Sequence, residues 1–425
     1  MSKVYNIALS VAKTAIKTVA AIAPDESSAK FLRFGRGQLS TRRDVEALGE
    51  KIDHCKPVFW IHAASLGEFA IARPIIRKLK STLDCIVVVT FFSPTGYEAL
   101  RRHPMREIDG VLYLPIDTEK NARHFVETLR PDCALFMVSE FWHNYLLELG
   151  RKKIPTFLVS ALIRDDAPFF NKWYGNIYRK SLETFSHIFT LDRHSLENLN
   201  KLGVKSASIN GDPLFDNAVQ IASSRWEDPI LNLFCNNRKV FVAGSIHEDE
   251  DLDMICDLAN RNPDTKFIIV PHEITPGVIS TLLSRLKGST VVYGNAAGEE
   301  IDKAQNLIVD FVGALASIYR YGTFAYVGGG FTPLLHSVIE PVVYGLPVAF
   351  GPKIHRKVAA RQLIEEGIGR SVSDAVELEK WFSELRLNPS ALSDIKERAD
   401  RYVKQNIGAT PRVADAVIKS IKDAR

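Results

Sequence analysis

The chain has 425 residues, more than one hydrophobic core usually supports, and this length predicts two domains of about 200 residues each. Apolar residues make up 46% of the sequence and charged residues 24%, which excludes a disordered or fibrous chain. The formal charge of +4 is too small to indicate nucleic acid as the main partner. Five cysteines without a C-x-x-C pair indicate reduced thiols in a cytosolic compartment, not disulfides or a zinc site.

The first 45 residues have a pattern of their own. Apolar and polar side chains between residues 3 and 22 fall on opposite stripes of a helix, and the lysines inside this stretch disfavour both a membrane span and a cleaved leader. Basic and aromatic residues follow at 30–43, a combination typical of an amphipathic segment lying on an anionic membrane leaflet. The alternative is a helix packed on its own domain or on a second subunit.

From residue 57 onward, short apolar runs alternate with amphipathic helical stretches, which predicts parallel sheets with crossover helices. We therefore expect an α/β fold with two doubly wound units, at 46–216 and 217–425, and a hinge region at 217–237. Facing each other across a cleft, such units can hold a donor and an acceptor beyond the carboxyl ends of their strands. The expected strands are 58–61, 86–90, 134–138, 156–159 and 187–190, then 240–243, 267–270, 290–293, 324–327 and 347–350.

Glu68 closes the segment HAASLGE, which follows the first strand directly and opens a helix. At a helix N-terminus, the macrodipole and the free amide groups favour an ionised carboxylate. Because this position is at the carboxyl edge of the sheet, Glu68 is a candidate general base for an acceptor hydroxyl. The alternative is an acid that only caps its helix.

A second carboxylate, Glu140, follows another strand of the same unit in the segment SEFWHN. We expect it to reach the same cleft, where a carboxylate beside an aromatic ring suits a sugar. The alternative is a helix N-cap with Trp142 in the core.

A glycine-rich loop at 328–341 follows an apolar strand of the second unit. Glycines let the backbone approach a ligand, and the helix N-terminus beyond them can receive a phosphate. Glu340 could then accept hydrogen bonds from vicinal ribose hydroxyls. The spacing is not G-x-G-x-x-G, so a hydride-transfer cofactor is not indicated.

Other strand ends of the second unit carry polar loops at 244–247, 271–273 and 351–357, which offer donors for an anionic leaving group. A solvated surface is the alternative for each loop. The acidic run at 248–253 has Asp-x-Asp spacing but opens a predicted helix, where acids complement the dipole without a cation. We therefore expect no metal.

The order and spacing of these segments resemble the bacterial lipid A Kdo transferases, a family of GT-B-fold glycosyltransferases that handle 3-deoxy-D-manno-octulosonic acid (Kdo). The resemblance runs from about residue 57 to residue 405. The segments that carry it are WIHAASLGE (60–68), TFFSPTGYEAL (90–100), YLPID (113–117), SEFWHN (139–144), GDPLFDN (211–217), AGSIHEDE (243–250), VPHE (270–273) and YVGGGFTPLLHSVIEP (326–341).

The resemblance implies an inverting transfer of Kdo from CMP-Kdo to the lipid A precursor lipid IVA, in lipopolysaccharide biosynthesis and without a metal or other cofactor. Glu68 would be the base and Glu140 a transition-state group. The enzyme would work at the cytoplasmic leaflet of the inner membrane, attached peripherally or anchored by its N-terminal helix. The implied CMP-binding residues are Pro271, His272, Val312, Gly313, Ala314, Ser337, Val338, Ile339 and Glu340, and the candidate phosphate contacts are Ser245, Lys353 and Arg356.

Some positions depart from the family pattern. Leu214 stands where the family has a cation that steadies the departing phosphate, His272 where it has arginine, and Ser337 where it has asparagine. Losing one charge-assisted contact in a water-poor site costs roughly 2.7 to 4 kcal/mol. Two alternatives stay open: a low-activity or inactive paralogue that binds nucleotide sugar or lipid, and a GT-B enzyme with another donor, such as a UDP-sugar. Candidate substitutes for the missing cation are Arg164, Lys353, Arg356 and His272.

Overall fold

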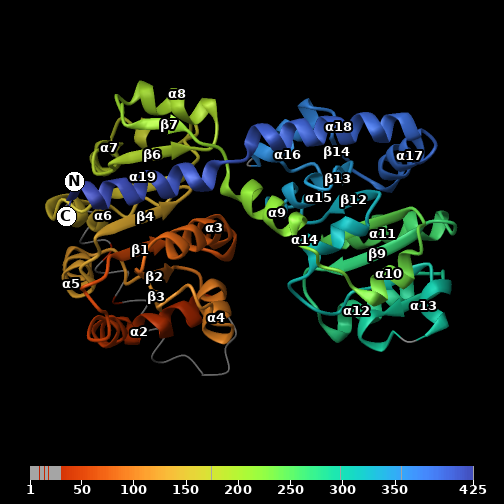
Figure 1. Ribbon diagram of the computed structural model, residues 1–425, viewed down its shortest axis with the longest axis horizontal. Helices are drawn as coiled ribbons and strands as arrows, with labels where there is room; N and C mark the ends of the chain where they lie inside the picture. The colour runs from red at the N-terminus through yellow and green to blue at the C-terminus, as the bar shows by residue number, and fades with distance from the viewer. Residues whose placement is uncertain are drawn as a thin grey trace. The chain divides into compact units, whose positions relative to one another are not determined.

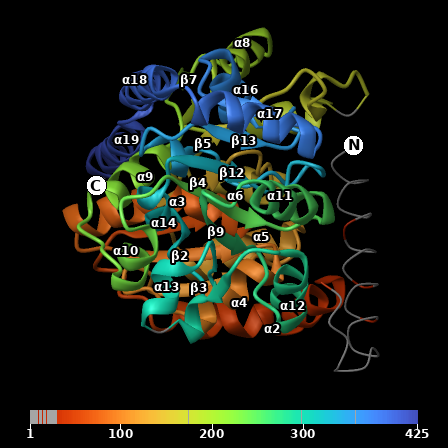
Figure 2. The same ribbon diagram turned by 90° about the vertical axis from the view of Figure 1, so that its right-hand side faces the viewer.

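The computed structural model describes residues 9, 14, 18, 30–173, 175–296, 298–355 and 357–424. The chain forms two compact units, one of Met1–Leu214 with Gly408–Arg425 and one of Phe215–Ile407. Each unit contains a seven-stranded sheet in which neighbouring strands run parallel, with helices on both sides (Figure 1 and Figure 2). The expected fold class, two doubly wound α/β units of the GT-B type, is confirmed. The cleft between them stays a prediction.

The sheet of the first unit has the strand order β3-β2-β1-β4-β5-β6-β7. The residues of β1, β4 and β5 are all buried, which explains why their sequences are continuous apolar runs without alternation. The strands are β1 (Val58–His62), β2 (Ile86–Phe91), β3 (Gly110–Tyr113), β4 (Cys133–Met137), β5 (Thr156–Ala161), β6 (His187–Thr190) and β7 (Ala207–Ile209). The helices are α2 (Lys30–Gly49), α3 (Leu66–Thr82), α4 (Pro94–Arg102), α5 (Glu119–Leu129), α6 (His143–Arg151), α7 (Gly175–Leu182), α8 (Arg193–Lys201) and α19 (Ala409–Ala424).

The sheet of the second unit has the order β10-β11-β9-β8-β12-β13-β14. Two helices, α9 (Pro213–Ser223) and α10 (Pro229–Cys235), occupy most of the stretch expected as a hinge. The strands are β8 (Val240–Ile246), β9 (Lys266–Pro271), β10 (Thr290–Val292), β11 (Asn306–Ile308), β12 (Phe324–Val327), β13 (Val348–Phe350) and β14 (Gly369–Ser371). The other helices are α11 (Asp249–Arg261), α12 (Pro276–Arg285), α13 (Glu299–Lys303), α14 (Leu315–Ile318), α15 (Ile339–Val342), α16 (Val358–Glu365), α17 (Ala375–Arg386) and α18 (Pro389–Asn406).

Every strand predicted from the sequence is present, and several extend further than expected. The sequence prediction missed β3, β7, β11 and β14. These strands have only three or four residues, and β7 and β14 are partly exposed, so they show neither a long apolar run nor a clear alternation.

The last helix corrects the expected second domain, which was to run to residue 425. Figure 1 shows α19 lying along the first unit. Arg412 fixes its start by donating to the side-chain and backbone oxygens of Asn210, at 2.9 and 2.7 Å. An apolar stripe makes a helix amphipathic but does not say which sheet it covers. The side chains that α19 buries in the core of the first unit are Val413, Ala414, Val417, Ile418 and Ile421.

The segment at 30–43 belongs to α2, which packs on the first unit as the alternative expected, and its association with a membrane stays a prediction. Phe34 is only 6% exposed, and its ring centroid lies 4.4 Å from that of Phe92. Arg33 donates two hydrogen bonds to Glu98, at 3.0 and 2.9 Å. The amphipathic helix expected before residue 24 lies outside the described residues, apart from positions 9, 14 and 18. In the part of the chain that is described, no helix combines the length and the apolar character that a membrane crossing requires.

Candidate active site

Glu68 lies in the first turn of α3, as expected. The backbone N–H of Glu68 donates to Ser65 Oγ at 3.4 Å, and the Glu68 carboxylate accepts a hydrogen bond from the backbone N–H of Ala64. These two hydrogen bonds together form a reciprocal helix cap. Glu68 therefore does cap its helix, and the cap holds its carboxylate at the carboxyl end of β1.

Burial raises the pKa of Glu68 to about 8; the negative charge of Glu140 adds to this increase, and the N–H groups of Ala64 and Ser65 oppose it. Desolvation thus outweighs the amide groups and opposes the ionised form that the helix N-terminus was expected to favour. A carboxyl group whose pKa lies near the working pH is suited to general acid–base chemistry.

Glu140 follows β4 and is held by two ring nitrogens. Its Oε2 accepts a hydrogen bond from Trp142 Nε1 at 2.6 Å and lies 3.3 Å from Nε2 of His62. The N-cap of α6 is Trp142, so the alternative that Glu140 itself caps this helix is wrong. Trp142 is half-buried and directs its N–H to the carboxylate. The Glu140 side chain is 16% exposed and remains open to a ligand.

His62 joins Glu140 to the interior of the sheet. It is fully buried, and its Nδ1 lies 2.8 Å from Thr90 Oγ1, which also accepts a hydrogen bond from Trp60 Nε1. Because a carboxylate only accepts, His62 presents an Nε2–H to Glu140, and its Nδ1 forms the second hydrogen bond with the Thr90 hydroxyl. No role for His62 was expected from the sequence. The pairing of β1 with both β2 and β4 brings His62, Thr90 and Glu140 together, and the spacing of these residues along the chain does not reveal that pairing.

The backbone immediately before Glu140 is strained. Val138 has φ 58°, in the left-handed region that β-branched residues rarely adopt, and Ser160 on the neighbouring β5 has φ 54°. The pairing of β5 with β6 shifts register at this point. Strain of this kind costs about 1 to 3 kcal/mol per residue and clusters at functional sites. The strained turn redirects the chain as it leaves β4 and begins the loop that carries Glu140.

A hollow of about 480 Å³ opens beside Glu140. This volume is in the range of small-molecule sites, and most of the lining is apolar or aromatic. On the adjoining loop, Trp173 is 84% exposed. The residues that line the hollow are Ser139, Glu140, Phe141, Trp142, Leu162, Arg164, Ala167, Pro168, Phe169 and Tyr178.

In the second unit, three histidine rings meet at the carboxyl edge of the sheet. His272 follows β9, and its ring centroid lies 4.4 Å from that of His336 and 5.0 Å from that of His247. Burial, with contributions from His272, Lys357 and His247, lowers the pKa of His336 to about 4. Nε2 of His336 is buried and has no hydrogen-bond partner among the described residues. Such a nitrogen is suited to a hydrogen bond with a ligand.

The acidic run at 248–253 holds the glycine-rich loop. Asp251 is fully buried and accepts hydrogen bonds from the N–H of Gly329 at 2.9 Å and from the hydroxyl of Tyr326 at 2.6 Å. Glu248 accepts from the N–H of Phe331 at 2.7 Å. Both residues also cap α11. These two acids therefore bind backbone groups, and the acidic run begins a helix, as predicted.

Glu340 lies in α15, a single turn of four residues, so the loop before it does not lead into the extended helix N-terminus expected for a phosphate. Burial raises the pKa of Glu340 to about 7. Among the residues that the structure describes, none donates a hydrogen bond to its carboxylate. Glu340 is half-buried, and a carboxylate without a protein donor can accept hydrogen bonds from a ligand that brings hydroxyl groups.

The other predicted donor-site residues follow strands of the same parallel sheet and so lie at its carboxyl edge. Val312 is 79% exposed, and Gly313 beside it has φ 97°, which a glycine adopts without strain. Val338 and Ile339 are each only 3% exposed, so their side chains face the core. Arg356 lies outside the described residues. The remaining positions are Ser245 within β8, Pro271 at the end of β9, Ala314 before α14, Ser337 before α15 and the exposed Lys353 after β13.

Comparisons with known proteins agree with this architecture. Residues 32–217 match the model of a family described as 3-deoxy-D-manno-octulosonic-acid transferase (kdotransferase). The 3-deoxy-D-manno-octulosonic acid transferase of Aquifex aeolicus is 28% identical over 370 residues, covering 84% of this chain and 93% of that protein. That of Bordetella pertussis is 26% identical over 377 residues, covering 84% and 86%.

Solved structures share the fold at low identity. UDP-GlcNAc 2-epimerase from Neisseria meningitidis aligns with a TM-score of 0.61 at 15% identity, over 85% of this chain and 100% of that chain. MurG from Acinetobacter baumannii aligns with a TM-score of 0.54 at 13% identity, over 86% and 99%. These likenesses concern the fold alone. The family model covers most of the first unit and the relatives extend over most of the chain, so this protein is similar to Kdo transferases along most of its length.

Proposed function

We propose that the protein transfers Kdo from CMP-Kdo to a hydroxyl of the lipid A precursor lipid IVA, with inversion and without a metal. The observation that supports this most is the pair of carboxyl groups at one strand edge, Glu68 and Glu140. The pKa of Glu68 is raised to about 8 beside an anion that two ring N–H groups hold in place. Each carboxyl group thus has a distinct environment and a distinct role.

In the proposed reaction, ionised Glu68 accepts the proton of the acceptor hydroxyl. The hydroxyl oxygen forms a bond to the anomeric carbon of Kdo while the bond from that carbon to the phosphate oxygen breaks, and CMP leaves with the electron pair. Positive charge develops on the anomeric carbon, and the carboxylate of Glu140, fixed by Trp142 and His62, stabilises that charge. The reaction therefore needs Glu68 deprotonated at the start.

The carboxyl edge of the second sheet would hold CMP-Kdo. Glu340 would accept hydrogen bonds from the ribose hydroxyls, because no described residue supplies a donor to it. The rings of His247, His272 and His336 would contact the phosphate in place of the family's arginine. Two acids that could have suggested a metal, Glu248 and Asp251, already bind backbone N–H groups. Because these two carboxylates already accept hydrogen bonds from the protein, they support a reaction that does not use a metal.

We further propose that the protein works at the cytoplasmic face of the bacterial inner membrane, where its lipid acceptor lies. The apolar hollow beside Glu140 and the exposed ring of Trp173 support contact with a lipid. The expected N-terminal amphipathic helix would add to this attachment.

The test is the mass of the lipid product after incubation with CMP-Kdo and lipid IVA. E68Q should lower kcat about 100-fold or more, since removing a general base has effects of that size. The matched control is E377Q: Glu377 is a first-turn acid of α17 that accepts from the backbone N–H of Ser373 at 2.8 Å, so its loss removes the same kind of helix cap from the other unit. Equal rates for E68Q and E377Q would exclude Glu68 as the base.

A second measurement addresses the alternative donors and the inactive paralogue. Only a ligand that binds the native state raises the melting temperature, so CMP should raise it and UDP should not. A shift with UDP alone would replace CMP-Kdo by a UDP-sugar. A shift with CMP but no lipid product would favour a binding paralogue. Leu214→Arg, which restores the family's cation at a position packed on the first core, would then be expected to raise turnover.

A further inference from the structure

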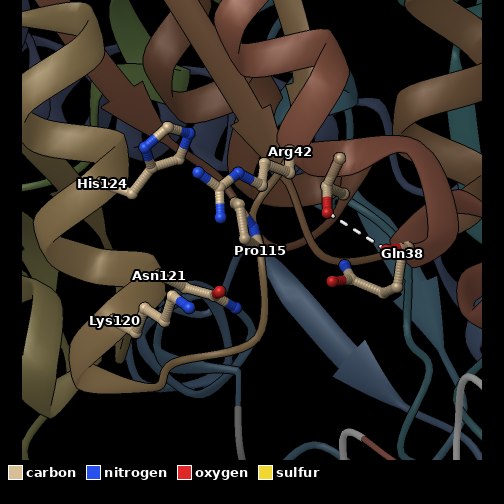
Figure 3. Close-up of a pocket in the computed structure, with 7 residues that line it drawn as sticks. Gln38, Arg42, Pro115, Lys120, Asn121 and His124 are labelled. Carbon is tan, nitrogen blue, oxygen red and sulfur yellow. Dashed lines mark hydrogen bonds between the residues drawn. The ribbon is translucent and has the colours of Figure 1, made fainter.

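A second hollow of the first unit, of about 130 Å³, lies between α2, α5 and the loop after β3 (Figure 3). Its chargeable side chains come from two helices and are all basic: Arg42 from α2, and Lys120 and His124 from α5. Of the described residues that line it, none is acidic. The full lining is Gln38, Thr41, Arg42, Pro115, Lys120, Asn121 and His124.

The basic groups around this hollow are only partly neutralised. Arg42 uses its Nε to donate to Glu46 at 3.1 Å, and Figure 3 shows the rest of its guanidinium directed toward His124. Nε2 of His124 lies 3.2 Å from the same Glu46 carboxylate. Lys120 is exposed and has no ion pair or hydrogen bond with another described residue. One carboxylate therefore faces three basic groups, which leaves the hollow with a positive charge.

The floor of the hollow is fixed by the fold. Gln38 is only 1% exposed, donates from Nε2 to the backbone oxygen of Leu114 at 2.9 Å, and accepts at Oε1 from the N–H of Ile116 at 3.1 Å. Asn121 donates from Nδ2 to the backbone oxygen of Ile116 at 2.8 Å. These hydrogen bonds hold the loop after β3 between α2 and α5, so the backbone around the hollow is fixed by buried groups.

The hollow shares a sheet edge with the candidate carboxyl pair. β3, β2 and β1 are parallel neighbours, and a spacing of about 4.8 Å per strand puts the ends of β3 and β1 roughly 10 Å apart. Aromatic rings line this edge: the centroid of Phe92 lies 4.4 Å from that of Phe34 on α2 and 5.2 Å from that of Trp142, which bonds to Glu140. Phe92 is 39% exposed. A row of packed aromatic rings, of which Phe92 is exposed, therefore extends from α2 to the ring that bonds to Glu140.

We propose that Arg42, Lys120 and His124 bind a phosphate group of the acceptor and thereby position its reacting hydroxyl at Glu68. This inference rests on the proposed function. Arginine binds phosphate through two parallel hydrogen bonds, and lysine adds a point charge. The lipid A precursor is a phosphorylated, acylated sugar, so a phosphate about one sugar unit from the reacting hydroxyl would lie over the hollow while apolar parts cover the row of aromatic rings. An anionic phospholipid headgroup offers the same chemistry and is the competing source.

The test uses the R42Q/K120Q double variant of the full chain. Both side chains are exposed, so the fold should tolerate their loss. In micelles of neutral detergent without phospholipid, we expect the KM for lipid IVA to rise about 10-fold while kcat changes by less than about twofold. With lipid IVA from which the phosphates have been removed, the unaltered protein and the double variant should have equal KM values.

The matched control is R43Q/R123Q, which removes the same charge from the same two helices at exposed positions that do not line the hollow. Its KM for lipid IVA should stay unchanged. Equal KM values for the two double variants in micelles, with weaker flotation of R42Q/K120Q alone on phosphatidylglycerol vesicles, would overturn the acceptor assignment and give the site to the membrane. If R42Q/K120Q and R43Q/R123Q have equal KM values and float equally on the vesicles, the hollow is not a phosphate-binding site. Absence of transfer by the unaltered protein would instead refute the proposed function.

Discussion

Two acids occupy the same position in the two units but have different surroundings. Glu68 and Asp251 are both the third residue of a helix that follows a strand, and both accept hydrogen bonds from the backbone just before that helix. Glu68 has the N–H groups of Ala64 and Ser65 and a neighbouring carboxylate. Asp251 accepts from three backbone N–H groups and from the hydroxyl of Tyr326. The number of donors, more than the position in the helix, distinguishes a candidate base from a structural acid.

The comparison extends to the two strand edges as a whole. In the first unit, side chains hold the side chain of Glu140 in place and leave its carboxylate at the surface of a hollow. In the second unit, Glu248 and Asp251 hold a backbone loop in place, and neither acid bonds to the histidine rings or to Glu340. This contrast agrees with the proposal that the first edge transfers a proton and the second binds the donor. Three measurements test it.

The largest effect is expected for D251A. It leaves buried N–H groups and the Tyr326 hydroxyl without an acceptor, so the free energy of unfolding should fall by about 3 kcal/mol or more in urea titrations. CMP binding should weaken as well, because the glycine-rich loop loses its anchor. D253A is the control: Asp253 lies on the same helix, is 70% exposed and pairs with Arg285. Similar losses for both variants would contradict the structural role of Asp251.

A smaller effect is expected in the pH dependence of kcat/KM. Glu68 must be ionised to act as the base, so activity should rise with pH up to about 8, the raised pKa of this residue. E140Q removes the neighbouring charge that helps to raise this pKa, so its rising limb should move toward lower pH although its rate is reduced. If the rising limb of the kcat/KM profile lies at the same pH in E140Q as in the unaltered protein, Glu140 does not act on Glu68 through its charge.

The third effect is expected in the pH dependence of stability. A carboxyl group whose pKa is raised by folding stabilises the native state below its unfolded value near 4.5, and this contribution is lost as pH rises toward 8. E68Q has no such group to ionise. Its free energy of unfolding, compared with that of the unaltered protein, should therefore improve between pH 5 and pH 9 by a few kcal/mol, about 1.4 kcal/mol for each pH unit between pH 5 and the raised pKa. A difference that does not change with pH would contradict the raised pKa.

The sequence by itself determined the elements and the edges at which the site residues lie. Apolar runs of strand length alternating with amphipathic stretches indicated two parallel sheets, and the strand-end positions of Glu68, Glu140 and Glu340 followed from that order. These inferences succeed because helix and strand periodicity are local properties that a single segment carries. The capping of α11 by its acidic first turn was predictable for the same reason.

Which groups meet, and how burial shifts their pKa values, depended on contacts between distant parts of the chain. His62 contacts Thr90 and Glu140, which lie 28 and 78 positions away, and α19 returns to the first unit. The pKa of Glu68 depends on burial and on a neighbour from another strand, and α2 packs on the sheet although its basic pattern suggested a membrane. Strand pairing, burial and long-range contacts determine these results. The hydrophobic periodicity of a single segment contains no information about any of the three.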